Sequence, residues 1–203
     1  MEDTNTMIEG SIAKKIIYFA IPLFLGNLFQ QLYNTADSLI VGNFLGSSAL
    51  AAVASSGNLI FLLVGFFNGL SVGAGVVIAR FFGAHDHRRV RLSIHTTVAL
   101  GIICGLVLTG VGVIFAPKIL VLMGTPQDVL PDSIIYFRIY FMGSLAFVLY
   151  NAFTGILQAL GDSKHSLYYL IISSVIIVVL DIVLITVFHM GVDGAAIATV
   201  ISQ

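Results

Sequence analysis

The sequence predicts an all-α fold: a polytopic bundle of transmembrane helices with about five complete spans and the start of a sixth. Its 203 residues are 58% hydrophobic and only 9% charged, and the mean hydropathy of +1.05 exceeds what a soluble domain needs to fill one core. Apolar runs of about 20 residues, each long enough to cross a hydrocarbon layer of roughly 30 Å as a helix, occupy nearly the whole length. The net charge of −1 gives no basic footprint for nucleic acid. We therefore expect a partner that is a lipid bilayer and not a nucleic acid.

Polar and glycine-containing breaks divide the chain into these spans. The last apolar run is about ten residues long, roughly half a membrane crossing, so we expect the chain to be a fragment of a longer protein. No stretch indicates a linker or a soluble region, and residues 1–203 are expected to form a single transmembrane domain. The expected spans are 14–45, 49–80, 92–116, 133–160 and 167–188, with an incomplete one at 194–203.

Basic residues gather beside alternate breaks, and cytoplasmic loops of membrane proteins carry the excess of Lys and Arg. The asymmetry predicts a multi-pass protein of a bacterial plasma membrane, with the N-terminus and the loops 81–91 and 161–166 in the cytoplasm. The basic residues on that side are Lys14, Lys15, Arg80, Arg88, Arg89, Arg91 and Lys164, against Lys118 and Arg138 on the other.

Asp37 lies within the first apolar run, which has no Lys or Arg after Lys15. A carboxylate at bilayer depth costs roughly 2.5 to 3.5 kcal/mol on insertion scales, so it persists mainly where it faces a protein interior or a wet cavity. Four amides fall with it inside an arc of about 120° on the helix. The stripe predicts a cavity that handles cations, although amides alone also serve as hydrogen bonds between membrane helices. These amides are Asn27, Gln30, Gln31 and Asn34.

Pro22 lies in the same run, fifteen residues before Asp37. A proline inside a helix removes a backbone donor and favours a bend. The bend is either a hinge of a moving gate or a static kink, and the sequence leaves both open.

Asp181 is the second acid inside an apolar run, with Ser174 one heptad before it on the same face. Two acids from separate helices can share a proton or another cation. The alternative is a single acid at a helix end near the outer surface.

Glycines recur at four-residue spacing in the second and third spans, at Gly65, Gly69 and Gly73 and at Gly101 and Gly105. This spacing is typical of closely packed membrane helices.

The segment 69–73 also spells the G-x-S-x-G of hydrolase elbows, with His95 in the next span, so an intramembrane serine hydrolase is a remote alternative. That elbow needs a strand before it, whereas this segment is apolar and glycine-rich throughout. We expect no enzyme. The pair His85 and His87 alternates with arginines in a loop, and no metal site is assigned.

Several segments in the correct order resemble the N-terminal lobe of the multidrug and toxic compound extrusion (MATE) family, in its DinF-like bacterial branch. The resemblance implies a lobe of six helices, which pairs with a C-terminal lobe absent from this chain. The matching segments are FAIPL at 19–23, QQLYNTAD at 30–37, GNFLG at 42–46, ALAA at 49–52, GILQALGD at 155–162, VLD at 179–181 and GVDGAAIAT at 191–199.

The resemblance also implies a coupling site for a cation or proton at Asp37, Asp181 and Thr199, and a hinge at Pro22. Gln30, Asn34 and Ser174 are the expected polar lining of the cavity. Where the family usually has an asparagine one turn before the second aspartate, this chain has Ile177. Because Ile177 offers no oxygen ligand, that departure weakens the case for a complete sodium site.

The implied function is a secondary antiporter lobe that exports amphipathic or cationic drug-like molecules. The expected exchange is for protons, with sodium as the second choice and no other cofactor. A flippase for lipid-linked oligosaccharides is one alternative, although the spans hold almost none of the cationic residues that would meet a pyrophosphate. A nonfunctional truncated transporter product is another alternative.

Overall fold

The computed structural model describes residues 12–203, and all regular structure within that range is helical. The all-α bundle predicted from the sequence is confirmed. By length and composition, four helical segments could cross a membrane alone, and α4 with α5 would make a fifth if the bent pair is one span. The elements are α1 (Ile12–Phe44), α2 (Ser47–Gly83), α3 (His87–Leu122), α4 (Leu130–Met142), α5 (Ser144–Ala159), α6 (Ser163–Ile182), the π-helical turn η1 (Val183–Val187) and α7 (Val192–Ser202).

The segment expected as one span at 133–160 is two helices, α4 and α5, whose axes differ by 49°. The break falls at Gly143, where the backbone is buried against Val200 of α7. The sequence offers no local reason for a bend there, because glycine is common inside membrane helices.

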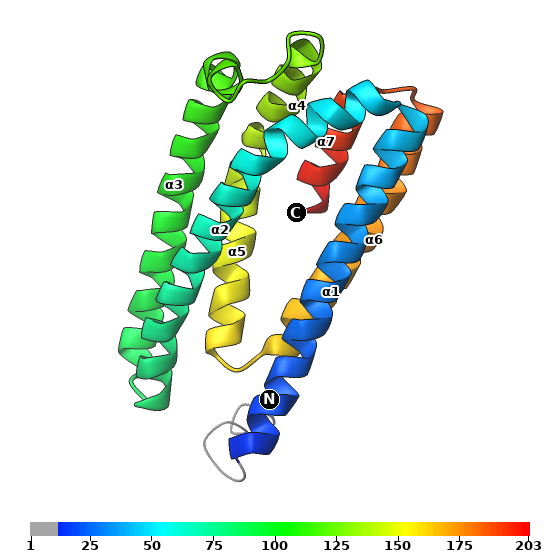
Figure 1. The fold of residues 1–203 in the computed structure, drawn as a ribbon. Coiled ribbons are helices and arrows are strands. Elements are labelled where there is room, and N and C mark those ends of the chain that lie inside the picture. Colours follow the sequence, from blue (N-terminus) through cyan, green and yellow to red (C-terminus); the bar gives the residue numbers. More distant parts are fainter. Residues whose placement is uncertain (1–11) are drawn as a thin grey trace.

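Short turns connect the helices at two ends of the bundle (Figure 1). At one end, Asp86 and Asp162 cap α3 and α6, and each carboxylate accepts a backbone N–H three residues later, at 3.0 Å and 3.1 Å. These caps satisfy donors that a helix start leaves free. At the other end Gly46, with φ of 87°, turns the chain from α1 into α2, a conformation that glycine adopts readily.

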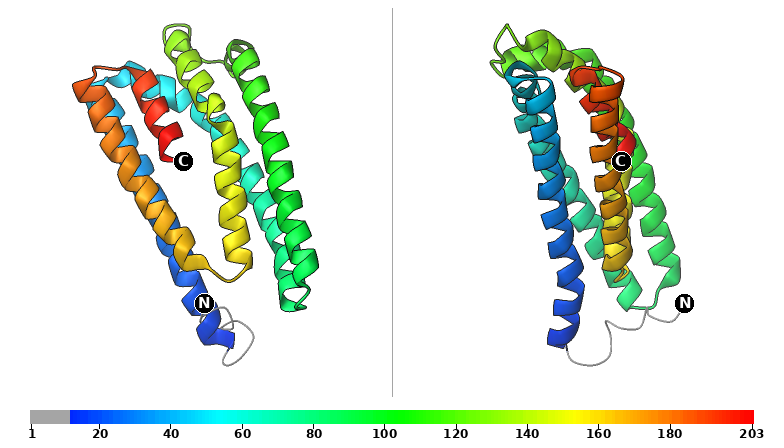
Figure 2. Two further views of the ribbon diagram at one scale, coloured as in Figure 1. Left: turned by 180° about the vertical axis from the view of Figure 1, so that it is seen from behind. Right: turned by 90° about the vertical axis from the view of Figure 1, so that its right-hand side faces the viewer.

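The helices form two groups that meet at one end and diverge toward the other (Figures 1 and 2). One group is the pair α1 and α6. The other contains α2, α3, α4 and α5. Helix α7 lies between the groups, near the end where they meet. A core cluster that includes Val41 of α1, Ala52 of α2, Tyr136 of α4 and Ala196 of α7 fills that junction.

Glycines of α3 let neighbouring helices approach closely. A Cβ atom at Gly105 would lie 2.8 Å from Cα of Leu145 in α5. The close packing predicted for the third span is confirmed there. In α2 the close approach occurs at Gly75, beside the regular series: a Cβ atom there would lie 3.4 Å from the Gly155 carbonyl oxygen in α5. No atom of the described chain lies within 4 Å of a Cβ built on Gly65, Gly69 or Gly73.

The segment 69–73 lies entirely inside α2. No strand precedes it in the described residues, so it does not form the elbow that a serine hydrolase requires.

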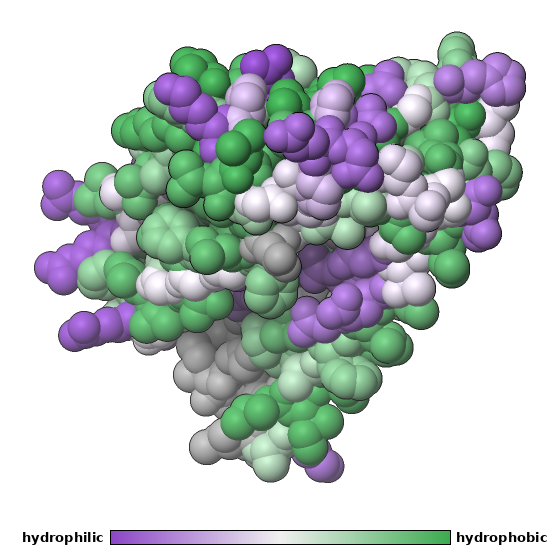
Figure 3. Space-filling model, turned by 45° about the horizontal axis from the view of Figure 1, so that its top comes forward, coloured by the Kyte–Doolittle hydropathy of each residue, from purple (hydrophilic) through white to green (hydrophobic). Residues whose placement is uncertain are grey.

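Large apolar side chains cover much of the outer surface, as the green areas of Figure 3 show. Phe61 is 80% exposed and Leu122 is 90% exposed. A soluble monomer rarely presents apolar patches on this scale, whereas lipid tails or apolar protein partners would cover them.

Candidate functional site

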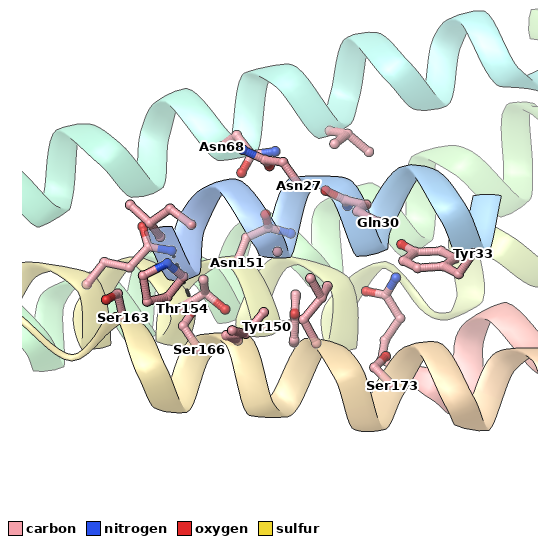
Figure 4. Close-up of a pocket in the computed structure, with 18 of the residues that line it drawn as sticks. Asn27, Gln30, Tyr33, Asn68, Tyr150, Asn151, Thr154, Ser163, Ser166 and Ser173 are labelled. Atoms are coloured by element: carbon pink, nitrogen blue, oxygen red, sulfur yellow. Dashed lines mark hydrogen bonds between the residues drawn. The ribbon is translucent and has the colours of Figure 1, made fainter. Parts of the chain in front are cut away.

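A pocket of about 270 Å³ lies between the two helix groups, with walls from α1, α2, α5 and α6 (Figure 4). Apolar side chains such as Leu23, Val64 and Phe147 form part of the wall. Every polar side chain that lines it is a neutral amide or hydroxyl. These are Asn27, Gln30, Asn68, Asn151, Gln158 and Gln203, with Tyr33, Tyr150, Thr154, Ser163, Ser166 and Ser173.

Some of these groups already hold one another or the backbone in place. Asn151 donates to the Phe147 carbonyl at 2.8 Å, and Gln158 donates to the Ser166 hydroxyl at 3.4 Å. Asn68 has no hydrogen-bond partner within the described part of the chain, so its amide remains available to a ligand. The pocket thus combines a fixed polar wall with free donors and acceptors.

The two predicted acids meet beside this pocket. Asp37 of α1 and Asp181 of α6 lie close enough for their carboxyl groups to interact. Asp181 is fully buried, and Oδ1 of Asp37 and both carboxylate oxygens of Asp181 have no donor from the described residues. Two buried carboxyl groups in contact need a proton or another cation between them, because like charges in apolar surroundings repel strongly.

Tyr136 and Thr199 complete this acid cluster, which we define as Asp37, Asp181, Tyr136 and Thr199. The Thr199 hydroxyl lies next to the Tyr136 hydroxyl, and both acids are near enough to Tyr136 for their charges to act on it. Thr199 donates its own proton to the Ala195 carbonyl at 2.9 Å, so its oxygen is left to accept from a neighbour. Tyr136 is only 5% exposed and was missed in the sequence. The sequence signal that could have identified it is a tyrosine inside an apolar run, because a buried tyrosine hydroxyl needs a polar partner.

The remaining predicted residues are divided between the pocket and other surroundings. Pro22 lies inside α1 and, like Gln30, lines the pocket. Asn34 is exposed and does not line this pocket. Ser174 is buried, donates to the Leu170 carbonyl at 2.7 Å and does not line it either. Ile177 is 3% exposed and lies one turn before Asp181, so no amide reaches the acids from that position.

Two connections join the pocket to the acid cluster. Tyr33, another residue missed in the sequence, lines the pocket one helical turn before Asp37. A second cavity of about 10 Å³, close to the size that holds one water molecule, is lined by Thr199 and Tyr140 and shares Phe147 and Gln203 with the pocket. The pocket and the acid cluster are therefore neighbours that share α1 and the residues around the small cavity.

Comparison with known proteins gives consistent matches. A family model described as MatE matches residues 22–183. The chain is 38% identical to the probable multidrug resistance protein YoeA of Bacillus subtilis (strain 168), and the match covers 98% of this chain and 44% of that protein. It is also similar to crystal structures described as MATE in the bent conformation, with TM-score 0.92 and 29% identity, and in the straight conformation, with TM-score 0.90 and 30% identity.

Both structural matches cover 100% of this chain and only 45% and 44% of those chains, so the chain spans less than half the length of the proteins it matches. These relatives are multi-pass membrane transporters, which confirms the expectation of a membrane protein that is not an enzyme. Because the family model matches more than half of the residues, the chain belongs to the MatE family.

Proposed function

We propose that this chain is a lobe of a secondary antiporter that exports amphipathic, drug-like compounds in exchange for protons. The observation that carries the proposal is the contact between Asp37 and Asp181 beside a neutral pocket. The acid cluster would take up the driving ion and the pocket would take up the exported compound. We also propose that a second, C-terminal lobe completes the transporter, since the relatives are about twice as long as this chain.

The lining of the pocket supports amphipathic substrates. Leu23, Val64 and Phe147 offer apolar contacts, while the free amide of Asn68 and its neutral neighbours offer hydrogen bonds. A positive charge on the substrate would be attracted to the acids, of which Asp37 lies one helical turn beyond Tyr33. It would then compete with the driving ion for those acids. Competition of this kind is the simplest basis for exchange.

The acid cluster supports protons better than sodium. Sodium is a hard cation that prefers several oxygen ligands, and Ile177 supplies none where an amide would reach the acids. A proton needs only one carboxyl group, and apolar surroundings favour the neutral form of an acid.

The experiment is transport by the full-length protein in sealed vesicles. An imposed pH gradient is expected to drive export of ethidium, and a sodium gradient at equal pH is expected to have no effect. Ethidium movement that follows the sodium gradient alone would contradict proton coupling, and movement under neither gradient would contradict antiport.

Pro22 is proposed as the hinge of α1. It lies in the wall of the pocket, and a bend there would move Asp37 relative to Asp181. Similarity to MATE structures in both bent and straight conformations supports a moving helix.

We propose that the end of the bundle that carries Arg80, Arg88 and Lys164 faces the cytoplasm. Residues 1–11, which the sequence also assigns to the cytoplasm, lie outside the described residues. Single cysteines at 88 and 128 in a Cys104→Ala background test this orientation. A reagent applied outside intact cells should label position 128 and leave position 88 unmodified, and the opposite pattern would reverse the topology.

A flippase for lipid-linked oligosaccharides is not favoured. A pyrophosphate carries negative charge and is typically held by Arg or Lys, whereas the polar residues that line the pocket are neutral.

A further inference from the structure

Gly143, at the break between α4 and α5, lies directly against Val200 of α7. A Cβ atom at position 143 would lie 2.5 Å from Cγ2 and 2.7 Å from Cγ1 of Val200, far inside van der Waals contact. Valine is β-branched and has one strongly preferred χ1 rotamer in a helix, so it does not turn aside easily. Val200 therefore fills the space that a larger residue at position 143 would need.

One face of the bent span runs through this break from the acid cluster to the pocket. Tyr136 and Tyr140 lie one turn apart on α4, with stacked rings whose centroids are 6.4 Å apart. Phe147 follows Gly143 by one turn on α5 and donates its N–H to the Gly143 carbonyl at 3.1 Å, and Asn151 follows by another turn. Tyr136 belongs to the acid cluster, whereas Phe147 and Asn151 line the pocket. The bend at Gly143 thus lies midway between the two sites.

The last five residues of the chain, 199–203, also reach from the acid cluster past the bend to the pocket. Thr199 lies beside the Tyr136 hydroxyl, Val200 packs on Gly143 and Gln203 lines the pocket. Thr199, Val200 and Gln203, with Gly143, line the small cavity between the two sites. A shift of α7 at the acid cluster therefore reaches the bend and the pocket together.

We propose that Gly143 and Val200 are positioning residues of a joint that transmits the ion occupancy of the acid cluster to the pocket. When the cluster gains or loses its ion, Tyr136 and Thr199 rearrange, Val200 shifts against Gly143, and the angle between α4 and α5 changes. The walls that carry Phe147 and Asn151 move with α5. Tightly packed joints of this kind switch between discrete arrangements and do not deform continuously. The inference rests on the proposed antiport, because antiport supplies the two ligands that the joint would couple.

The test measures equilibrium binding of ethidium to the full-length protein across a series of pH values, alongside pH-driven export. Coupled ligands change one another's affinity reciprocally, typically by ~5- to 150-fold, so the Kd of the unsubstituted protein should depend on pH. The groups whose titration this reports are Asp37, Asp181, Tyr33, Tyr136 and Tyr140. Gly143→Ala should keep the Kd within about threefold at one reference pH, lose most of its pH dependence, and slow export by about tenfold or more, because α7 is forced off the bend.

Val200→Ala should rescue this variant, because it removes the two methyl groups that the new Cβ would strike and leaves only the Cβ of residue 200, at 3.1 Å. The double variant should recover pH dependence and export to within about threefold of Val200→Ala alone, a non-additive result typical of residues in contact. Gly69→Ala, in α2, is the matched control, since no described atom lies within 4 Å of its Cβ position.

Three outcomes would overturn the joint: a Gly143→Ala variant with full pH dependence, a double variant that is not rescued, and a double variant that fails to fold. Misfolding of Gly143→Ala alone, with a folded and coupled double variant, would support it. If the unsubstituted protein shows neither export nor a pH-dependent Kd, both the proposed antiport and the proposed joint are wrong. Export in the unsubstituted protein with no effect of Gly143→Ala would leave antiport standing and remove only the joint.

Discussion

The acid cluster and the pocket are adjacent, yet their side chains differ in chemistry. The cluster is small: Asp181 is fully buried and Tyr136 nearly so, and Oδ1 of Asp37 and both carboxylate oxygens of Asp181 have no donor from the described residues. The pocket is large, and its polar lining consists of amides and hydroxyls. Both draw on α1, so one helix contributes to two sites with different chemistry.

This contrast indicates a division of roles. Buried carboxyl groups are costly unless a cation or proton compensates them, so the cluster has a strong requirement for an ion. Amides and hydroxyls are satisfied by many partners, each contributing modestly. We propose on this basis that the pocket accepts varied substrates and that the cluster binds one small ion.

The largest effect should come from Asp37→Asn in the full-length protein. The substitution removes the charge at nearly constant volume, so the fold should remain and ethidium should still bind in the pocket. Ion-driven export should fall by about 100-fold or more, since the ion no longer has an acid on α1. Export rates and binding are measured side by side, with Asp193→Asn at the start of α7 as the control. Wild-type export by Asp37→Asn would remove the central assignment.

A smaller loss should follow Asp181→Asn. Asp37 retains its carboxyl group and gains an amide neighbour that can donate to it, so part of the ion binding survives. Export should slow by about tenfold, which corresponds to roughly 1.4 kcal/mol of lost coupling, while ethidium still binds in the pocket. The same vesicle assay applies. If Asp181→Asn instead weakens ethidium binding and leaves the ion dependence intact, the two sites are not separate in the way described.

Ile177→Asn should sharpen the contrast by altering only the cluster. Burying an amide in place of an apolar side chain without full hydrogen bonding should lower the free energy of unfolding by about 1 to 3 kcal/mol. The new oxygen should also favour sodium, so sodium should raise the thermal unfolding midpoint of the variant and not that of the unsubstituted protein. Thermal unfolding in detergent with sodium or choline salts tests this. Equal responses of both proteins would exclude a role for position 177 in ion choice.

The helices and the two acids could be predicted because their signals are local. Long apolar runs define membrane helices on their own, and an acid such as Asp37 or Asp181 inside such a run is conspicuous. Tyr33 and Tyr136 were missed because tyrosine is amphipathic and is as common at a membrane interface as in a buried site. Only the fold shows that their hydroxyls lie near the acids.

The bend at Gly143 and the open surroundings of three glycines of α2 could not be predicted, because each depends on distant segments. The residue that makes glycine necessary at 143 is Val200, on another helix. Conversely, Gly65, Gly69 and Gly73 have the right spacing for close packing, but no described helix lies against them. Spacing along one helix shows which face could be approached, and it does not show whether a partner is there.

The smallest effect should come from the pocket, through Asn68→Ala. Its amide has no partner within the described residues, so its loss removes one neutral hydrogen bond to a ligand and leaves the wall intact. Such a bond contributes about 0.5 to 1.5 kcal/mol, so the Kd for ethidium or a related compound should rise by only ~2- to 10-fold. The ion dependence of export should not change, because Asn68 is not part of the acid cluster. Asn34→Ala is the matched control, since Asn34 is an exposed amide that does not line the pocket. Binding titrations with several unrelated substrates give the decisive comparison: a small loss for each would fit a tolerant neutral pocket, whereas a large loss for one compound alone would show that the pocket is specific after all.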